Sequence, residues 1–248
     1  MCSLLVSNNV KHVHFYGDSY MRHMYVATSI MLTKNYNDAS HSSENSHCKY
    51  GNQFSEEASC RATVRPTIAS CNGNVQLALH QTADPKLGTC GKGHLNFWSE
   101  GNHPVDFNYK TRLGVNDPVE YQKKYSDPKR AICPQLASGQ KHCSLFWIST
   151  HARPLQKYSD ENDDKVRDFN EKMRSFFEAG TCGKETGYID VYNMTSNLVH
   201  HHGTEIEFMT FDTAHWGMEV NLAKVQIIMS ALKQFTSNCF QNVSSSKN

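Results

Sequence analysis

Apolar residues fall into short unbroken runs and into longer stretches with helical spacing. The short runs predict buried strands, and they occupy residues 13–16, 145–148 and 188–192. The longer stretches repeat apolar residues every three or four positions, which predicts helices over residues 20–32, 159–179 and 218–235. Because strands alternate with helices, the pattern predicts an α/β fold in which helices cover both faces of a central parallel sheet.

The stretch 36–142 lacks this regularity. It is rich in Asn, Ser, Gly and Cys, and its apolar runs are short, as at residues 75–79. We expect it to form loops and to be a large insertion in a single domain that spans residues 1–248, with two domains as the alternative. We expect the insertion to shape a substrate site, unless it is a surface elaboration without contact to substrate.

Composition narrows the class of protein. The 248 residues, 38% of them hydrophobic, suffice for one sizeable core. With 25 basic and 24 acidic side chains the formal net charge is +1, which argues against a nucleic-acid-binding surface and a basic membrane-binding face. No apolar run approaches the ~20 residues that span a bilayer. Residues 1–10 do not form a convincing signal peptide, so a secretory protein would carry its targeting segment outside this chain.

Nine cysteines favour the secretory pathway lumen or an extracellular location over the alternative, a cytoplasmic protein with free thiols. We expect Cys2 to be the odd cysteine. The other eight can form four disulfides: Cys48, Cys60, Cys71, Cys90, Cys133, Cys143, Cys182 and Cys239. Asn193 and Asn242 each begin a glycosylation acceptor pattern, which agrees with the secretory interpretation.

The first candidate for chemistry is Ser19, in the tripeptide Gly17-Asp18-Ser19. It lies between the predicted strand at 13–16 and the predicted helix at 20–32. A serine at such a turn has its hydroxyl exposed at the carboxyl edge of the sheet. Its own backbone N–H lies at a helix N-terminus and can face a developing oxyanion. Asp18 is expected to be a structural hydrogen-bonding residue of the turn.

Asp212 and His215 are the second candidate pair. They lie three residues apart, so the carboxylate can hold one imidazole nitrogen and leave the other free. His215 can then serve as the base for Ser19. The order Ser, Asp, His along the chain is one of several that build such a triad. Whether the two ends of the chain meet depends on the fold.

These motifs resemble the first and last blocks of the SGNH (GDSL-type) hydrolases. The similarity is closer to the PC-esterase branch, which includes the trichome-birefringence-like O-acetyltransferases, the sialic-acid O-acetyltransferase domain and the neurexophilin-and-PC-esterase proteins. Arg22 three residues after the serine, Trp216 after the histidine and the segment 189–195 favour that branch. The resemblance covers the first thirty or so residues and about the last hundred.

The resemblance implies a three-layer SGNH-like fold and a serine enzyme that acts on O-acetyl groups of carbohydrate. Its partner would be an O-acylated small molecule or glycan. An esterase passes the acyl group to water, whereas an O-acetyltransferase passes it from an acetyl donor to a sugar hydroxyl. A non-catalytic carbohydrate- or protein-binding module on the same fold is the more distant alternative. No cofactor and no metal are expected, and the histidine tract at 200–202 is expected to be a loop.

The chain departs from the parent pattern at the oxyanion hole. No Gly-x-Asn-Asp segment is present, and loss of one such donor typically costs about 3 kcal/mol of transition-state stabilisation. Besides the N–H of Ser19, we expect donors among the side chains after the strand at 145–148 and the backbone N–H groups of two glycines. These candidates are Ser149, Thr150, His151, Gly73 and Gly91.

Three further residues are candidates for contact with substrate. Arg22 lies on the first turn of the predicted helix, where it buttresses the turn or binds substrate. Arg153 can meet a carboxylate of a sugar or acyl donor, or remain a solvated loop residue. Trp216 can stack on a sugar ring, or pack against the last helix. His12 and His14 alternate along the first strand, and we expect hydrogen bonds to satisfy them within the fold.

Overall fold

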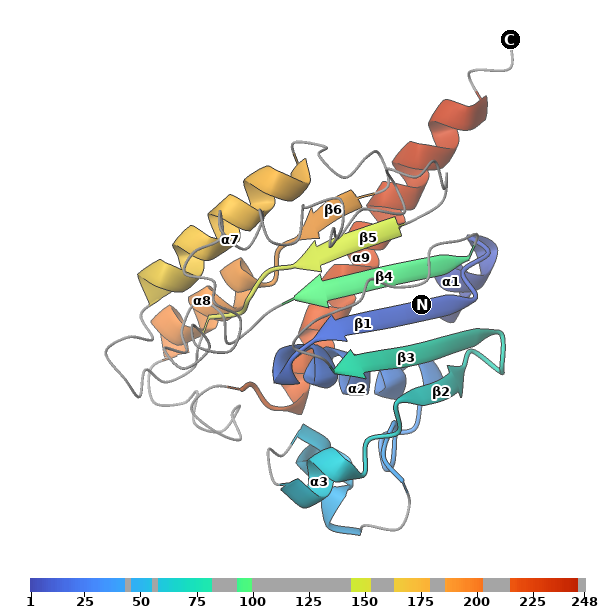
Figure 1. Ribbon diagram of the computed structural model, residues 1–248, viewed down its shortest axis with the longest axis vertical. Helices are drawn as coiled ribbons and strands as arrows, with labels where there is room; N and C mark the ends of the chain where they lie inside the picture. The colour runs from blue at the N-terminus through green and yellow to red at the C-terminus, as the bar shows by residue number, and fades with distance from the viewer. Residues whose placement is uncertain are drawn as a thin grey trace, which may run out of the picture.

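The computed structural model describes residues 1–42, 46–54, 58–81, 93–99, 144–152, 163–178, 186–202 and 215–244. These residues contain a six-stranded sheet with the strand order β2-β3-β1-β4-β5-β6 (Figure 1). Only β2 is antiparallel to its neighbour. The strands are β1 (His12–Gly17), β2 (Thr67–Ser70), β3 (Val75–Gln81), β4 (His94–Ser99), β5 (Ser144–Ile148) and β6 (Thr186–Ile189). The predicted α/β class with a largely parallel sheet is therefore confirmed.

Helices precede, connect and follow these strands. The α-helices are α1 (Cys2–Ser7), α2 (Ser19–Thr33), α3 (Ala58–Ala62), α7 (Asp163–Glu178), α8 (Tyr192–His202) and α9 (Met218–Ser244). Two short 3-10 helices, η1 (Ser46–Cys48) and η2 (Tyr50–Phe54), precede α3. Adjacent residues of β5 meet helices on opposite faces of the sheet, since Phe146 packs against Phe235 of α9 while Trp147 packs against Phe169 of α7. Helices of the described part of the chain thus contact both faces of the sheet at β5.

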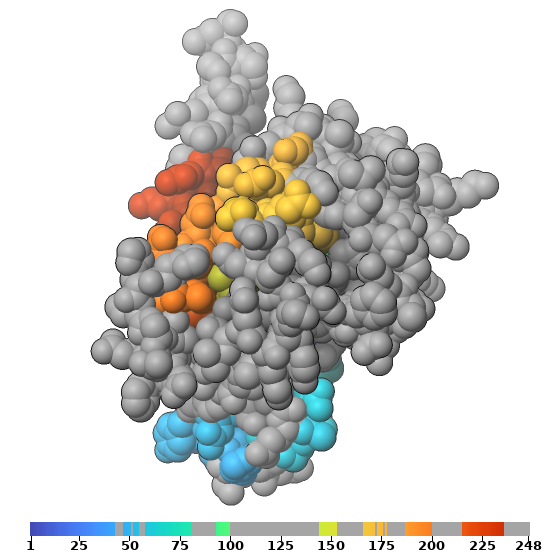
Figure 2. All heavy atoms as spheres, turned by 90° about the vertical axis from the view of Figure 1, so that its left-hand side faces the viewer, coloured from blue at the N-terminus to red at the C-terminus, as the bar shows by residue number. Residues whose placement is uncertain are grey.

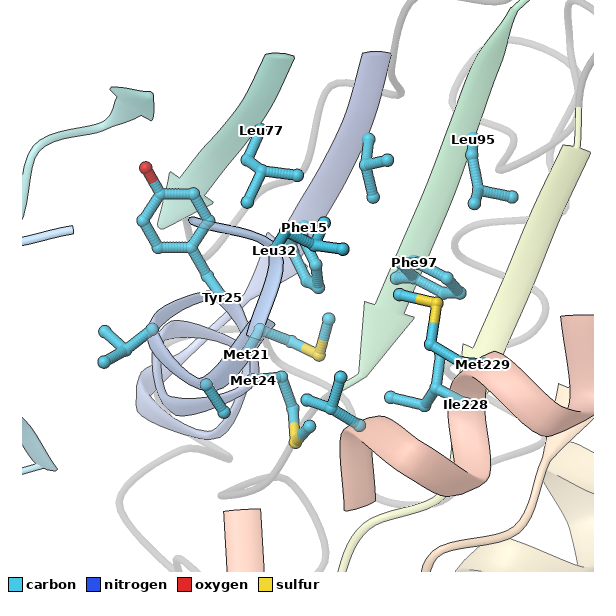
Figure 3. Close-up of a cluster of buried hydrophobic side chains, with 14 of the residues drawn as sticks. Phe15, Met21, Met24, Tyr25, Leu32, Leu77, Leu95, Phe97, Ile228 and Met229 are labelled. Carbon is cyan, nitrogen blue, oxygen red and sulfur yellow. The ribbon is translucent and has the colours of Figure 1, made fainter. Parts of the chain in front are cut away.

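The main core lies between the sheet and the pair α2 and α9. Figure 3 shows apolar side chains of β1, β3 and β4 directed toward these two helices. Phe15 and Phe97 lie on neighbouring strands with ring centroids 5.5 Å apart, and Met21 of α2 and Ile228 of α9 belong to the same buried cluster. Burial of each such side chain contributes roughly 1.5–3 kcal/mol. This packing holds the start of α2 and the start of α9 on the same face of the sheet.

The predicted helices at 20–32 and 218–235 are confirmed as α2 and α9, and the stretch 159–179 contains α7. The strand predicted at 188–192 is wrong in its second half, because β6 ends at Ile189 and α8 begins at Tyr192. The side chain of Asp190 explains the change. Its Oδ1 accepts a hydrogen bond from the backbone N–H of Asn193, which supports the first turn of α8. The loop predicted at 200–202 is also wrong, because α8 continues through the histidine tract and ends at His202.

The prediction that 36–142 consists of loops is wrong, because besides η1, η2 and α3 this stretch contains strands. This stretch contributes β2, β3 and β4, and the last two flank β1 on either side. The strands escaped prediction because one of their faces carries polar side chains. Asn96 of β4 and His80 of β3 lie on the same face of the sheet as His14 of β1, and the imidazoles of His14 and His80 are hydrogen-bonded to each other.

Two disulfides occur among the described residues. Cys48 pairs with Cys60, whereas Cys2 pairs with Cys71 and ties α1 to the turn between β2 and β3. The expectation that Cys2 is unpaired is therefore wrong. The cause is the fold, which places α1 beside that turn. Four of the other cysteines, Cys90, Cys133, Cys143 and Cys182, lie outside the described residues, and the side chain of Cys239 does too.

The disulfides are compatible with an oxidising, secreted or lumenal location. Within the described ranges, none of the helices combines the length and the apolar character needed to cross a bilayer.

On the side of the molecule drawn in Figure 2, two groups of described residues reach the surface. One is the segment from η1 to α3, in blue and cyan, and the other comprises α7, α8 and α9, in yellow, orange and red.

Candidate active site

The turn from β1 into α2 places Ser19 at the carboxyl edge of the sheet. Figure 1 shows β1, β4 and β5 pointing to this edge, with α8 nearby. Asp18 is the N-cap of α2, and its Oδ1 accepts a hydrogen bond of 2.9 Å from the backbone N–H of Tyr20. Asp18 thus has the structural role expected of it. Ser19 is the first residue of the helix, and its side chain is half-buried.

Ser19 and His215 meet across the fold. The distance between Ser19 Oγ and His215 Nε2 is 2.7 Å, although the residues lie 196 positions apart. His215 directly precedes the segment that leads into α9, and only 7% of it is exposed. This is the geometry that a histidine needs to accept the proton of a serine hydroxyl. Asp212, the predicted third member, lies outside the described residues.

Buried aromatic side chains surround His215. Tyr20 meets the imidazole edge-on with centroids 5.2 Å apart, and His23 lies 4.8 Å away at an angle of 52°. The ring of His151 stacks on the ring of Tyr20, with centroids 3.8 Å apart. Tyr20, His23 and His151 are all buried. The serine–histidine pair therefore lies against a wall from which water is largely excluded, where hydrogen bonds and charges act more strongly than in bulk water.

The backbone N–H of Ser19 is the best placed of the predicted oxyanion donors. It belongs to the first turn of α2, whose N–H groups have no partner within the helix. No hydrogen bond from this N–H to another described residue is present. The positive end of the helix dipole adds to its donor strength.

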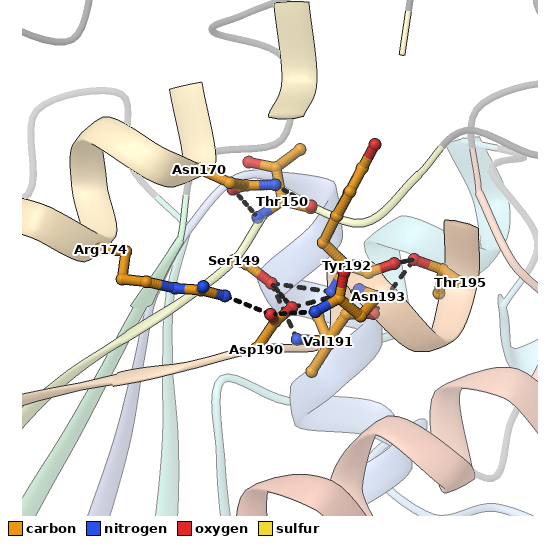
Figure 4. Close-up of polar contacts among 9 residues, drawn as sticks. All are labelled: Ser149, Thr150, Asn170, Arg174, Asp190, Val191, Tyr192, Asn193 and Thr195. Atoms are coloured by element: carbon orange, nitrogen blue, oxygen red, sulfur yellow. Dashed lines mark hydrogen bonds and ion pairs between the residues drawn. The ribbon is translucent and has the colours of Figure 1, made fainter. Parts of the chain in front are cut away.

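Ser149 and Thr150 have structural roles (Figure 4). The hydroxyl oxygen of Ser149 accepts hydrogen bonds from the backbone N–H groups of Val191 and Tyr192, at 2.8 and 2.9 Å. The backbone N–H and C=O of Thr150 pair with the side-chain amide of Asn170, at 2.9 and 2.8 Å. These contacts fasten the end of β5 to α7 and α8. Among the three side chains expected there, His151 is the one that lies beside Tyr20 and the candidate site.

Gly73 is not at the site. It lies in the turn that precedes β3, and its N–H donates to the carbonyl of Ser70. Since β3 runs parallel to β1 and Gly17 is in register with Gln81, Gly73 lies at the opposite edge of the sheet, roughly 20 Å or more from Ser19. The suggestion that its N–H serves the oxyanion hole is therefore wrong. Gly91 lies outside the described residues.

The structure favours packing roles for two of the three expected substrate contacts. Trp216 is fully buried, and its indole N–H donates to the carbonyl of Ala152 at 2.8 Å, so it does not present a face to a sugar. Arg22 is also buried, and its guanidinium lies 3.4 Å from Nε2 of His23, which agrees with buttressing of the turn. Arg153 lies outside the described residues.

A separate row of histidines crosses β3, β1 and β4. The two ring nitrogens of His14 lie 3.1 Å from His80 and 3.0 Å from His94, and His12 stacks on His94. Burial, with help from the neighbouring imidazoles, lowers the pKa of His14 to about 4, and burial also lowers the pKa values of His80 and His94. Across the described part of the chain, no three His, Cys, Asp or Glu side chains converge as a metal site would require.

Sequence reasoning missed Tyr20, His23 and Lys224. Lys224 is fully buried on α9, and its amine lies 2.7 Å from Nδ1 of His151. Its position was a usable signal, because it lies one helical turn from Val220 and one from Ile228, both of which are buried. Tyr20 and His23 lie on a helix that is buried nearly all round, so periodicity could not single them out.

Comparison of the chain with protein-family models, with curated proteins and with solved structures finds no match.

Proposed function

We propose that the protein is a serine-dependent acyl-ester hydrolase. The observation that carries the proposal is the 2.7 Å contact between Ser19 Oγ and His215 Nε2 at the carboxyl edge of a largely parallel sheet. Active groups gather at this edge in α/β proteins because the loops that follow the strands converge there. The capped start of α2 adds a backbone N–H beside the hydroxyl.

Each residue has a defined task in the proposed reaction. Ser19 Oγ attacks the carbonyl carbon of the ester while His215 Nε2 accepts its proton. The negative charge that develops on the carbonyl oxygen is stabilised by the N–H of Ser19, with His151 as the candidate second donor. The proton then passes from His215 to the leaving alcohol, and a water molecule hydrolyses the acyl-enzyme. Asp212 is proposed to hold the other nitrogen of His215.

The substrate proposal follows from the resemblance to the PC-esterase branch. It points to O-acetyl groups on carbohydrate, within a three-layer fold of SGNH type, and the site requires no cofactor. The same acyl-enzyme can pass its acetyl group to a sugar hydroxyl instead of water. The acceptor that reaches Ser19 decides between the esterase and the transferase.

The direct test is turnover of p-nitrophenyl acetate by wild type and by Ser19→Ala. We expect the substitution to lower kcat by about 10⁴-fold or more, since it removes the nucleophile. Ser7→Ala is the matched control, because Ser7 is exposed on α1 and is expected to leave the rate unchanged. Equal rates in all three proteins would overturn the proposal in favour of a binding module.

A second experiment separates hydrolysis from transfer. The wild-type protein would be incubated with p-nitrophenyl acetate and either xylan or a sialoside as acceptor, and acetylated product would be measured against released acetate. The proposal predicts free acetate as the main product with either acceptor. Acetylated glycan in excess over acetate would make the protein a transferase with the same nucleophile.

A further inference from the structure

A lysine behind the candidate active site has no role in the proposed chemistry. Lys224 lies on α9 and is fully buried. Burial holds the pKa of its amine well below the usual range, because the charged form loses its water. A buried amine is stable only with hydrogen-bond partners of defined geometry. Its partners therefore indicate what it does.

The amine of Lys224 joins two segments of the site. Nζ lies 2.7 Å from Nδ1 of His151 and 3.2 Å from Oδ1 of Asn221. The orientation of the Asn221 amide is set by its Nδ2, which donates to the carbonyls of Trp216 and Gly217 at 2.6 and 2.9 Å. Oδ1 is thus an acceptor, and the lysine is its donor. Neutral and charged amines both keep at least one more N–H for His151.

We infer that Lys224 is a positioning residue that holds His151 with its proton on Nε2 and its lone pair on Nδ1. The inference rests on the proposed function for its catalytic consequence, although the tautomer is a property of the folded protein alone. A charged amine has only N–H donors, so Nδ1 of His151 must then accept the bond, whereas a neutral amine has one lone pair as well. We take the lysine as the donor to Nδ1, as it is to Oδ1 of Asn221. The N–H of the imidazole is then on Nε2, at the ring edge away from the lysine.

The tautomer matters because His151 is close to the nucleophile. Its ring stacks on Tyr20, the residue after Ser19, and Tyr20 also touches His215. A second link, from the indole N–H of Trp216 to the carbonyl of Ala152, holds the same two segments together. His151 with its proton on Nε2 is therefore a fixed N–H donor in a site that lacks the asparagine of the parent pattern. A mixture of tautomers would offer that donor only part of the time.

The first test reads the tautomer directly. Long-range ¹H–¹⁵N correlation spectra of the full chain distinguish protonated from bare imidazole nitrogens, and His151→Gln identifies the His151 signals. The inference predicts a bare Nδ1 and a protonated Nε2 in wild type, and a mixture in Lys224→Met. A protonated Nδ1 in wild type, or an unchanged tautomer in Lys224→Met, would overturn it. This measurement does not depend on enzyme activity.

The second test is a double-mutant cycle on ester turnover. Lys224→Met replaces the amine with an apolar side chain of similar length, a change that buried positions tolerate. We expect it to lower kcat by about tenfold with little change in KM. Lys233→Met, at an exposed position of the same helix, is the matched control and should stay within about twofold of wild type.

The background for the cycle is His151→Gln, whose amide nitrogen can stand where Nε2 stands and has no tautomer to hold. In that background Lys224→Met should change kcat by less than about twofold, because the two residues act through one donor. An equal loss in both backgrounds would overturn the positioning role. If wild type turns over no ester at all, the proposed function fails, and the tautomer measurement alone decides the role of Lys224.

Discussion

Gly17 allows the chain to pass from β1 into α2 at a point where a side chain would not fit. Its φ is 144°, and a Cβ at this position would lie 2.2 Å from the carbonyl oxygen of Ser99 on β4. The same Cβ would lie 2.7 Å from Cγ of Met21. The close approach of β4 sets the direction in which α2 starts. Because Gly17 has no side chain, the chain can turn there and place Ser19 opposite His215.

The effect of Gly17→Ala tests this explanation. We expect it to lower the free energy of unfolding by about 3 kcal/mol, because the backbone conformation is strained for alanine and the Cβ meets backbone of β4. Gly73→Ala is the matched control: φ is +82°, yet nothing lies within 4 Å of the added Cβ, so about 1 kcal/mol is expected. Urea unfolding measures both. Equal losses would show that the contact with Ser99 is unimportant.

At the scale of elements, the strands β3, β1 and β4 differ on their two faces. One face is apolar and packs against α2 and α9. The other carries the row of histidines centred on His14, whose two ring nitrogens are both hydrogen-bonded to other imidazoles. A row of neutral imidazoles satisfies its own hydrogen bonds, whereas a second proton would place two charges a few ångströms apart. The row thus makes this part of the sheet sensitive to acid.

The stability of the protein should therefore fall in mild acid. The pKa of His14 is about 4 in the folded protein, compared with 6.5 for a histidine in an unfolded chain. Between pH 6.5 and 4 the unfolded chain binds a proton that the folded chain does not, so stability is fully present above pH 6.5 and is lost as pH falls through this window. His14 alone contributes on the order of 3 kcal/mol to this change.

The measurement is the free energy of unfolding at several pH values between 7.5 and 4.5. His14→Gln should reduce the slope of the free energy of unfolding against pH by the equivalent of about one bound proton. His47→Gln is the control, because His47 is exposed and lies outside the row of histidines, and it should leave the slope unchanged. An unchanged slope in His14→Gln would contradict the assignment.

The polar face of the sheet explains why some elements could be predicted from the sequence and others could not. β1, β5 and α2 have regular apolar patterns and were predicted near their observed bounds, whereas α9 begins where it was predicted but extends beyond 235 to Ser244. β3 and β4 were assigned to loops because the polar residues of one face pair with each other, a tertiary arrangement that a single strand does not reveal. The end of β6 was misplaced since Asp190 starts α8 through a side-chain bond.

The residues of the candidate site that lie in local sequence motifs could be predicted from the sequence. Ser19 follows from a capped turn between strand and helix, and His215 from its motif, although their contact depends on the packing of α2 against α9. Tyr20, His23 and Lys224 were missed. Each is buried beside the site by that same packing. The spacing of Lys224 from Val220 and Ile228 places it on the buried face of α9, whereas nothing in the local sequence distinguishes Tyr20 and His23 from other residues of α2.

At the scale of the whole molecule, contacts between distant residues close the fold. Ser19 meets His215 across 196 positions, and the disulfide Cys2–Cys71 closes a loop with a separation of 69. Cys48–Cys60 has a separation of only 12. A cross-link restricts the unfolded chain more when the loop it closes is longer. The first disulfide is therefore expected to stabilise the fold more than the second.

Paired Cys→Ser substitutions test that ranking. Loss of Cys2–Cys71 should lower the free energy of unfolding by about 4 kcal/mol and loss of Cys48–Cys60 by about 3 kcal/mol, in the chain-entropy description. Denaturant unfolding of the two double variants under the same oxidising conditions gives both values. A larger loss from Cys48–Cys60 would mean that local packing, and not loop length, decides.

The central claim is that Ser19 is a nucleophile activated by His215. Its most direct test is reaction of the intact chain with a fluorophosphonate, followed by mass spectrometry of the digested protein. The account predicts one phosphonyl adduct, on the peptide that contains Ser19, and its loss in both Ser19→Ala and His215→Gln. No adduct in wild type, or an adduct that persists in Ser19→Ala, would contradict it.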